Sequence, residues 1–356
     1  MGTDNNISAD RFIIWLDVRG GYIMNLYLPS GYLNIAGILQ LGLPFNFIVG
    51  GRGTGKTYGA LKYAVESGRM FMLMRRTQEQ CNLINKPQFS PFKAICNDTG
   101  WDIRSESISK YNAAFMRDDD CIGYTCALST IANLRGFSAE DVTLCIYDEF
   151  IKEVHERPMK EEGTALLNAY ETMNRNRELK GQKPMQLLCL ANAFDIANPI
   201  FMTLGLVGIA ERMKQKQQEV YINRESGIGL FLPMSEKISG AKAKTALYKA
   251  TTGAYTEMAL SNEFAYNPTD YIKSQPLKEY SPMVTVGEIT IYKHKSGRRF
   301  YVTEHRSGNP DTFKTDEVDI KRFIRKYGRR LYLSYMAGRI YFENIYCKSL
   351  FEVYII

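Results

Sequence analysis

A glycine-rich segment, GGRGTGKT at residues 50 to 57, has the residue types and spacing of a phosphate-binding loop, G-x-x-x-x-G-K-[ST]. Its glycines allow the backbone to close around an anion with N–H groups pointing inward, at the start of a helix. Lys56 would add a point charge at the β- and γ-phosphates, and Thr57 a hydroxyl ligand for Mg²⁺. The alternative is a glycine-rich turn without a ligand. We predict that ATP and Mg²⁺ bind here, and the expected contacts are Gly51, Arg52, Gly53, Thr54, Gly55, Lys56, Thr57 and Tyr58.

Two adjacent carboxylates, Asp148 and Glu149, follow the apolar run TLCIY at residues 143 to 147. If that run is a strand of a parallel sheet, both carboxylates lie at the edge where ligands of such folds bind. We assign Asp148 to holding Mg²⁺, and Glu149 to orienting and polarising the attacking water. An acidic pair after an apolar strand is common by itself. Its combination with the upstream loop predicts a hydrolytic site.

Three further polar residues are candidates for the same chemistry. Asn192 follows the apolar run at residues 185 to 190, and its amide could sense the attacking water or the γ-phosphate; the alternative is an Asx turn. Arg175 stands near the end of an amphipathic pattern at residues 164 to 178 and could act as an arginine finger on a neighbouring subunit's nucleotide. The helix dipole favours a cation at such a position in any case. Arg52 could stabilise the phosphates in cis or project to solvent.

Four apolar runs must position these residues, and they occupy residues 45 to 49, 70 to 74, 143 to 147 and 185 to 190. The first run leads into the loop, and the segment YGALKYAVESG after the loop has apolar residues at helical spacing. This order predicts an α/β fold, a P-loop ATPase domain with a mostly parallel sheet flanked by helices. It suits the division in which the catalytic glutamate lies on the acidic strand and another strand, here 185 to 190, is inserted next to the loop strand.

Length and composition favour two folded domains, since the chain has 356 residues and is 45% hydrophobic. The seven cysteines are odd in number and never spaced C-x-x-C, which is typical of reduced thiols in a cytosol-like compartment. The sequence contains neither a run of 18 apolar residues nor a signal-like N-terminus, so we expect no membrane partner.

The positive charge is concentrated in the C-terminal part. Residues 211 to 356 carry 24 Lys and Arg against 16 Asp and Glu, although the whole chain has a net charge of only +7. This suggests a polyanionic partner, and a soluble basic surface is the alternative. From residue 281 the pattern changes to strands, with a hairpin around residues 295 to 297 and then a basic helix, DIKRFIRKYGRR. The candidates for phosphate contacts are Lys293, Lys295, Arg298, Arg299, Lys321, Arg322, Arg325, Lys326, Arg329 and Arg330.

From about Asn25 to the C-terminus, the chain resembles the DNA-packaging ATPases of φ29-like phages, which are related to large terminase subunits. The residues that carry the resemblance are FNFIVGGRGTGKTYG, YDEFIKE, ALLNAYETMNRNRE, CLANA with the following NP, and TGAYTEMALSNEF. The resemblance implies that Lys56 and Thr57 are the Walker A lysine and Mg²⁺ ligand, and that Asp148 and Glu149 are the Walker B aspartate and catalytic glutamate. It also implies that Arg175 is a trans-acting finger and Asn192 a coupling residue, with Ala191 where the family often has a hydroxyl residue.

The resemblance further implies a homopentameric ring at a portal vertex, bound through a packaging RNA, which pulls double-stranded DNA into a procapsid. Such a protein would act in the host cytoplasm and be absent from the mature virion. We expect the ATPase domain at residues 1 to 210, a helical linker or lid at 211 to 275, and a C-terminal α+β domain at 276 to 356 that resembles a vestigial RNase H-like nuclease. The alternatives are an active terminase with both activities and a P-loop switch that binds nucleotide without moving DNA.

Overall fold

The computed structural model describes residues 25–134, 140–152, 156, 159, 161–192, 196–250 and 271–355. The chain divides into two compact units. The first contains the described residues up to 192 and residues 212–250, and the second contains residues 196–211 and 271–355. The expected division at residues 210 and 275 differs from this one, because residues 212–250 belong to the first unit. None of the helices in the described ranges is long and apolar enough to span a bilayer.

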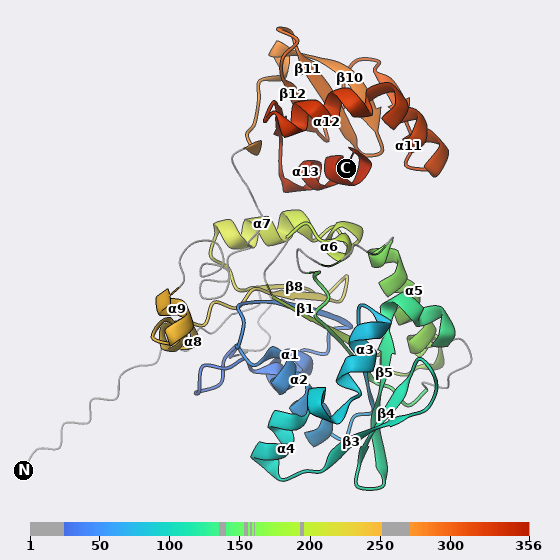
Figure 1. The fold of residues 1–356 in the computed structure, drawn as a ribbon, viewed down its shortest axis with the longest axis vertical. Helices are drawn as coiled ribbons and strands as arrows, with labels where there is room; N and C mark the ends of the chain where they lie inside the picture. Colours follow the sequence, from blue (N-terminus) through green and yellow to red (C-terminus); the bar gives the residue numbers. More distant parts are fainter. Residues whose placement is uncertain are drawn as a thin grey trace, which may run out of the picture. The chain divides into compact units, whose positions relative to one another are not determined.

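A nine-stranded sheet forms the centre of the first unit, in the order β3-β4-β5-β2-β6-β7-β1-β9-β8 (Figure 1). Its six strands from β5 to β9 in this order pair in parallel, whereas β3, β4 and β8 pair with their neighbours in antiparallel fashion. This confirms the predicted α/β fold with a mostly parallel sheet. The strands are β1 (Phe45–Val49), β2 (Phe71–Arg75), β3 (Ile103–Ser107), β4 (Ala113–Arg117), β5 (Asp120–Ala127), β6 (Leu144–Asp148), β7 (Gln186–Ala191), β8 (Val220–Asn223) and β9 (Ile228–Phe231).

Strand β7 lies between the acidic strand β6 and the loop strand β1, as the sequence predicted. Ile146 of β6 pairs with Leu188 of β7, and Cys189 of β7 pairs with Phe47 of β1. All three strands are parallel, so the loop after β1, the carboxylates after β6 and Asn192 after β7 emerge at one edge.

Helices cover both faces of this sheet. On one face, Ile38, Leu61 and Ile95 from three helices join the core formed by strand residues such as Ile48 and Ile146. On the other face, α5 buries Leu166, Ala169 and Met173. The helices of the first unit are α1 (Ile35–Gln40), α2 (Lys56–Glu66), α3 (Gln78–Ile84), α4 (Lys93–Thr99), α5 (Glu162–Asn174), α8 (Glu236–Ala243) and α9 (Ala246–Ala250).

The structure corrects the prediction of a helical linker at residues 211 to 275. Strands β8 and β9 lie within that range, and β9 runs parallel to β1, with Phe231 opposite Ile48. The sequence did not indicate these two strands, because VYIN and IGLF are only four residues long and are flanked by polar sequence. The segment TGAYTEMALSNEF at residues 252 to 264, which carries part of the family resemblance, lies outside the described residues.

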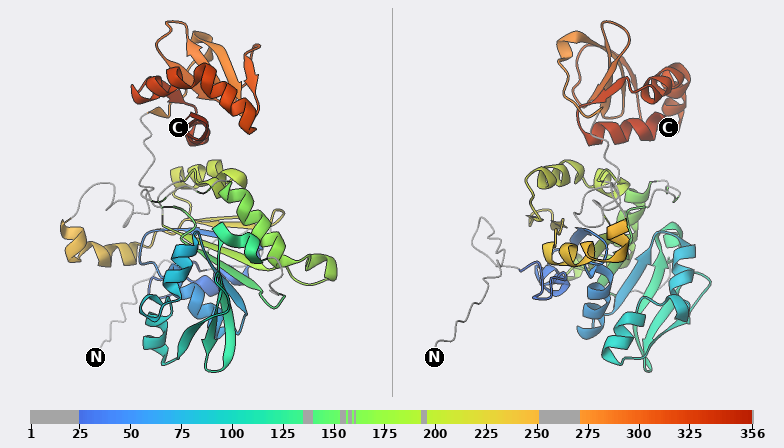
Figure 2. Two further views of the ribbon diagram at one scale, coloured as in Figure 1. Left: turned by 45° about the vertical axis from the view of Figure 1, so that its right-hand side comes forward. Right: turned by 60° about the vertical axis from the view of Figure 1, so that its left-hand side comes forward.

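The second unit has a five-stranded sheet in the order β13-β10-β11-β12-β14, with α11, α12 and α13 gathered on one face (Figure 2). Gly287, at φ +53°, and Glu288 form the turn between β10 and β11. The hairpin at residues 295 to 297 joins β11 to β12. The elements are α6 (Pro199–Thr203), α7 (Val207–Gln215), which begins in this unit, β10 (Tyr280–Val286), β11 (Ile289–His294), β12 (Phe300–Thr303), β13 (Asp311–Phe313), α11 (Glu317–Phe323), a π-helical turn (Ile324–Gly328), α12 (Arg329–Met336), β14 (Ile340–Phe342) and α13 (Ile345–Ile355).

Candidate nucleotide-binding site

The glycine-rich loop leads from β1 into α2 with two residues in the left-handed region, Gly53 at φ +72° and Gly55 at φ +84°. Gly55 is the N-cap of α2 and provides no side-chain hydrogen bond to the first turn. The residue at this position therefore does not cap the N–H groups at the start of α2. Uncapped N–H groups at a helix start are suited to binding an anion. Thr54 stabilises the loop by donating its hydroxyl hydrogen to the Gly51 carbonyl, 3.1 Å away.

Lys56 is buried at the base of this loop. Its Nζ donates to the carbonyl oxygens of Gly50 (3.0 Å) and Gly51 (2.8 Å) and to Oδ1 of Asn192 (3.2 Å). Burial lowers the pKa of Lys56 to about 7; Asp148 raises it, whereas Lys242 and Arg52 lower it further. A buried ammonium group that is repelled by two other cations is suited to binding an anion.

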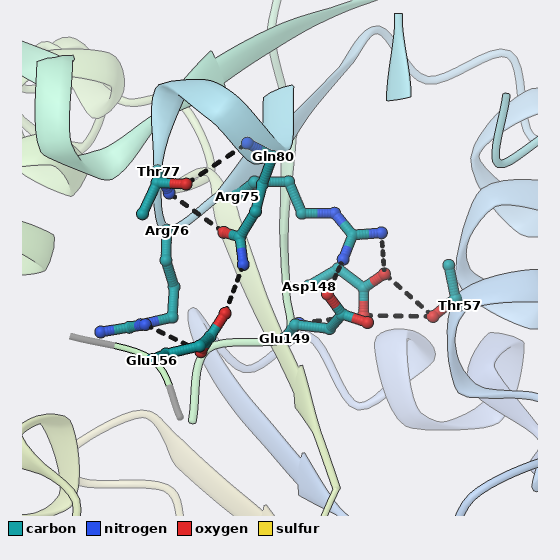
Figure 3. A network of polar contacts seen from close by, with 8 residues as sticks. All are labelled: Thr57, Arg75, Arg76, Thr77, Gln80, Asp148, Glu149 and Glu156. Carbon is teal, nitrogen blue, oxygen red and sulfur yellow. Dashed lines mark hydrogen bonds and ion pairs between the residues drawn. The ribbon is translucent and has the colours of Figure 1, made fainter. Parts of the chain in front are cut away.

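Thr57 and Asp148 face each other across the site (Figure 3). The Thr57 hydroxyl lies 3.1 and 2.9 Å from the two carboxylate oxygens of Asp148. A hydroxyl beside a carboxylate is an oxygen-ligand set of the kind that Mg²⁺ takes in phosphate-binding sites. Glu149 follows with φ +58°, and its side chain is 58% exposed. The predicted Walker residues are thus brought together at one edge of the sheet.

Two arginines at the end of β2 belong to this site, although their residue types and spacing predicted no role for them. Arg75 contacts Asp148 (Nη2 to Oδ2, 3.0 Å) and Glu149 (Nη1 to Oε2, 2.5 Å) (Figure 3). Although burial opposes it, the two carboxylates raise the pKa of Arg75. The position of Arg75 at the end of an apolar run could have indicated this role. Strand β2 is parallel to β6, so the two strands end at the same edge.

Arg76 connects the site to α5. Its side chain is fully buried, and it contacts Glu162 through Nε (2.7 Å) and Nη2 (3.1 Å) and Glu156 through Nη1 (3.0 Å). The hydroxyl of Tyr147, the residue before Asp148, donates to Glu162 at 3.1 Å. Gln80 of α3 donates to the other oxygen of Glu156 at 2.7 Å (Figure 3). The first turn of α5 is therefore tied to the end of β2 by a buried ion pair, and to the acidic strand β6 by the hydrogen bond from Tyr147.

Asn192 lies in the site and the cap of α6 is a different residue. The Oδ1 atom of Asn192 accepts from Lys56, whereas Asn198 is the N-cap of α6 and accepts from the N–H of Phe201 at 3.0 Å. The amide of Asn192 is thus close to the predicted position of the γ-phosphate, beside the Walker lysine.

Arg175 is not brought to the site of its own chain. It is the C-cap of α5, at φ +48°, and its Nη1 contacts Oε1 of Glu140 at 3.1 Å. Arg177, beside it, donates to the carbonyl of Val142 at 2.9 Å. These partners precede β6, so Arg175 lies at the opposite edge of the sheet from Asp148.

The two remaining residues that were predicted to contact the nucleotide are Tyr58 and Arg52. The hydroxyl of Tyr58 donates to Asp98 of α4 at 2.8 Å, which places it against α4 rather than in the loop. The carbonyl of Arg52 accepts from Nζ of Lys242 on α8. Tyr32, in the turn before α1, lies against Gly55, where an added Cβ would be 3.1 Å from its ring. Lys242 and Tyr32 were not predicted as site residues, because neither residue is near the loop in the sequence.

The predicted phosphate contacts of the second unit fall into two groups. Three of them form ion pairs with neighbouring carboxylates: Lys321 with Glu317 (2.7 Å), Arg322 with Asp319 (2.8 Å), and Lys326 with Asp311. The others lie on or near the β11–β12 hairpin, at Lys293, Lys295, Arg298 and Arg299, or on the π-helical turn and α12, at Arg325, Arg329 and Arg330. Arg330 also lies over the ring of Phe300, at 5.3 Å from its centre.

Comparisons with known proteins extend over nearly the whole chain. The model of a family described as podovirus DNA encapsidation protein (Gp16) matches residues 29–354. The chain is 26% identical over 333 residues to the DNA packaging protein of Bacillus phage PZA, and the match covers 88% of this chain and 94% of that protein. For the DNA packaging protein of Bacillus phage phi29, the identity is 25% with the same coverage.

Two solved structures share the fold. The Phi-28 gp11 DNA packaging motor has a TM-score of 0.62 and 19% identity, and the match covers 92% of this chain and 98% of that chain. The bacteriophage Phi-29 viral genome packaging motor assembly has a TM-score of 0.61 and 17% identity, with 91% and 98% covered.

Proposed function

This chain belongs to the podovirus DNA encapsidation protein family, and from that membership we propose that it hydrolyses ATP to move double-stranded DNA into a procapsid. The observation that carries the ATPase part is the meeting of Lys56, Thr57 and Asp148 at one edge of a parallel sheet. Family membership supports the proposal that the protein moves DNA. By the family resemblance, the protein acts in the host cytoplasm at the portal vertex.

The polyphosphate of ATP binds in the loop, where backbone N–H groups and Lys56 neutralise its charge. Thr57 and Asp148 would hold Mg²⁺, which supplies positive charge at the β- and γ-phosphate oxygens. Glu149 orients the attacking water and accepts its proton. Arg75, in contact with both carboxylates, keeps them side by side. Asn192 contacts Lys56 and is suited to sensing the γ-phosphate.

A neighbouring subunit completes the site. Arg175 is exposed over about a third of its side chain and lies at the far edge of the sheet from Asp148. This position supports a role in trans, where its charge would stabilise the transition state in the next subunit of a ring. We propose a homopentamer, attached to the portal through a packaging RNA, as the family resemblance implies.

The second unit is proposed to contact DNA and to be a vestigial nuclease. Because Lys321, Arg322 and Lys326 are paired with carboxylates, we place the DNA contacts chiefly at the β11–β12 hairpin. Within the described residues, Glu304 and Glu343 lie near Cys347 in an arrangement that could hold a metal ion. Burial raises the pKa of the Cys347 thiol, which disfavours the thiolate that a metal needs. A two-metal nuclease needs more carboxylates than this.

The test is the rate of ATP hydrolysis against added double-stranded DNA and procapsid. A motor is expected to turn over faster with both, and Glu149→Gln is expected to bind ATP without hydrolysing it. Slow turnover that is indifferent to DNA and procapsid would instead support a P-loop switch. Full turnover by Glu149→Gln would remove Glu149 from its catalytic role.

A further inference from the structure

The segment after β9 reaches the phosphate-binding loop for a topological reason. Strand β9 runs parallel to β1, so the residues that follow the two strands emerge at the same edge. Pro233 packs directly on the loop, since a Cβ added to Gly50 would lie 2.8 Å from Cγ of Pro233. Helix α8 therefore starts beside the loop, although the helix and the loop are far apart in the sequence.

The first turn of α8 is fixed to the turn that precedes α1. Ser235 caps the helix, and its hydroxyl donates to the carbonyl of Gly31 at 2.8 Å. Nζ of Lys237 donates to the carbonyl of Pro29 at 2.7 Å. Just before the helix, the N–H of Met234 donates to the buried carboxylate of Glu219 at 2.5 Å. These contacts hold the helix start at the loop.

The last turn of α8 places a second lysine on the loop. Nζ of Lys242 donates to the carbonyl of Arg52. A Cβ at Gly53 would lie 2.8 Å from Cε and 3.0 Å from Nζ of Lys242, so the absence of a side chain at Gly53 is what admits this lysine. The lysine thus lies against the backbone of the segment that is expected to surround the phosphates.

Two cations near the loop act on Lys56. Lys242 and Arg52 both lower the pKa of Lys56, and Asp148 is the carboxylate that opposes them. Burial and Arg52 also lower the pKa of Lys242 itself. The mutual repulsion of these cations would be relieved by a polyanion bound among them.

We propose that Lys242 is a phosphate-binding residue for the nucleotide, supplied in cis by α8. Its Nζ has three donors, so it can bind a phosphate oxygen and keep or release the Arg52 carbonyl. Because the start of α8 is fixed and its end would contact the nucleotide, the last turn of α8 responds to occupancy of the site. This inference rests on the proposed ATPase function and adds a residue to it.

The test is the affinity for a fluorescent ATP analogue with Mg²⁺. Lys242→Ala is expected to raise Kd by about ten- to a hundredfold, the effect of losing a charged hydrogen bond. Lys242→Arg should retain most of the affinity. Lys244→Ala is the matched control, because it also removes a lysine from the end of α8 but leaves the charge of Lys242 at the loop. Its Kd should equal that of the wild type.

An unchanged or a lower Kd for Lys242→Ala overturns the inference, and a lower Kd would show that Lys242 obstructs the site. Absence of nucleotide binding by the wild type would overturn the proposed ATPase function together with the role of Lys242. Normal binding by the wild type with an unchanged Kd for Lys242→Ala would overturn the role of Lys242 alone. A second measurement uses the wild type and does not depend on variant folding. ATP should slow acetylation of Lys242 by a lysine-modifying reagent and leave Lys237 unaffected, as read by mass spectrometry; equal acetylation of Lys242 with and without ATP overturns the inference.

Discussion

Nucleotide binding should be coupled to proton uptake by Lys56. Its pKa of about 7 in the nucleotide-free chain reflects burial first, then opposition by Asp148 and repulsion by Lys242 and Arg52. Above pH 7 most of the Lys56 side chains are therefore neutral. Phosphate groups bound next to Nζ favour the charged form and raise this pKa. Binding must then protonate the lysine, so the affinity should fall as the pH rises.

The magnitude follows from the pKa. At pH 8, about one-tenth of the free chains carry a charged Lys56, so binding should take up about 0.9 proton. Each pH unit above 7 should weaken binding about tenfold, or about 1.4 kcal/mol, until the pH reaches the pKa of the bound state. The phosphates of the nucleotide, whose last pKa is about 6, contribute little in this range.

The assay is isothermal titration calorimetry with a non-hydrolysable ATP analogue and Mg²⁺ at pH 7.5 and pH 8.5. Two buffers with different ionisation enthalpies give the number of protons taken up. Lys56→Arg is the control, because a guanidinium stays charged and its residual binding should take up no proton. A wild-type Kd that is the same at both pH values, with no proton uptake, would refute the reasoning from the burial of Lys56.

Three other predictions follow from the contacts. If Arg175 acts in trans, mixing Arg175→Ala chains with Glu149→Gln chains should restore part of the ATPase activity; mixed rings without any activity would exclude that role. Arg76→Met leaves Glu162 charged in the core and should lower the free energy of unfolding by about 3–5 kcal/mol, whereas adding Glu162→Met should recover most of the loss in urea denaturation. Incubation with plasmid and Mn²⁺ should give no cleavage, and cleavage that Glu288→Ala abolishes would contradict a vestigial nuclease.

The sequence by itself determined the elements around the loop. The strands were expected at residues 45 to 49, 70 to 74, 143 to 147 and 185 to 190, and β1, β2, β6 and β7 occupy these positions to within one residue. Continuous apolar runs are typical of strands that are buried on both faces, and the polar residue after each run marks its end. The order β6-β7-β1 was also predicted correctly, because the motif identified the P-loop division.

Only the tertiary structure decided which distant residues join the site. The short strand β9 gave little periodicity, so residues 211 to 275 were interpreted as a helical linker, and Lys242 had no place in the site. Its contact with Arg52 arises because β9 pairs with β1 in parallel. Likewise, the partners of Arg75 and Arg76 depend on which strands are neighbours at the sheet edge. Local sequence specifies where a strand ends. The residues that lie next to that end are specified by the pairing of strands that are far apart in the chain.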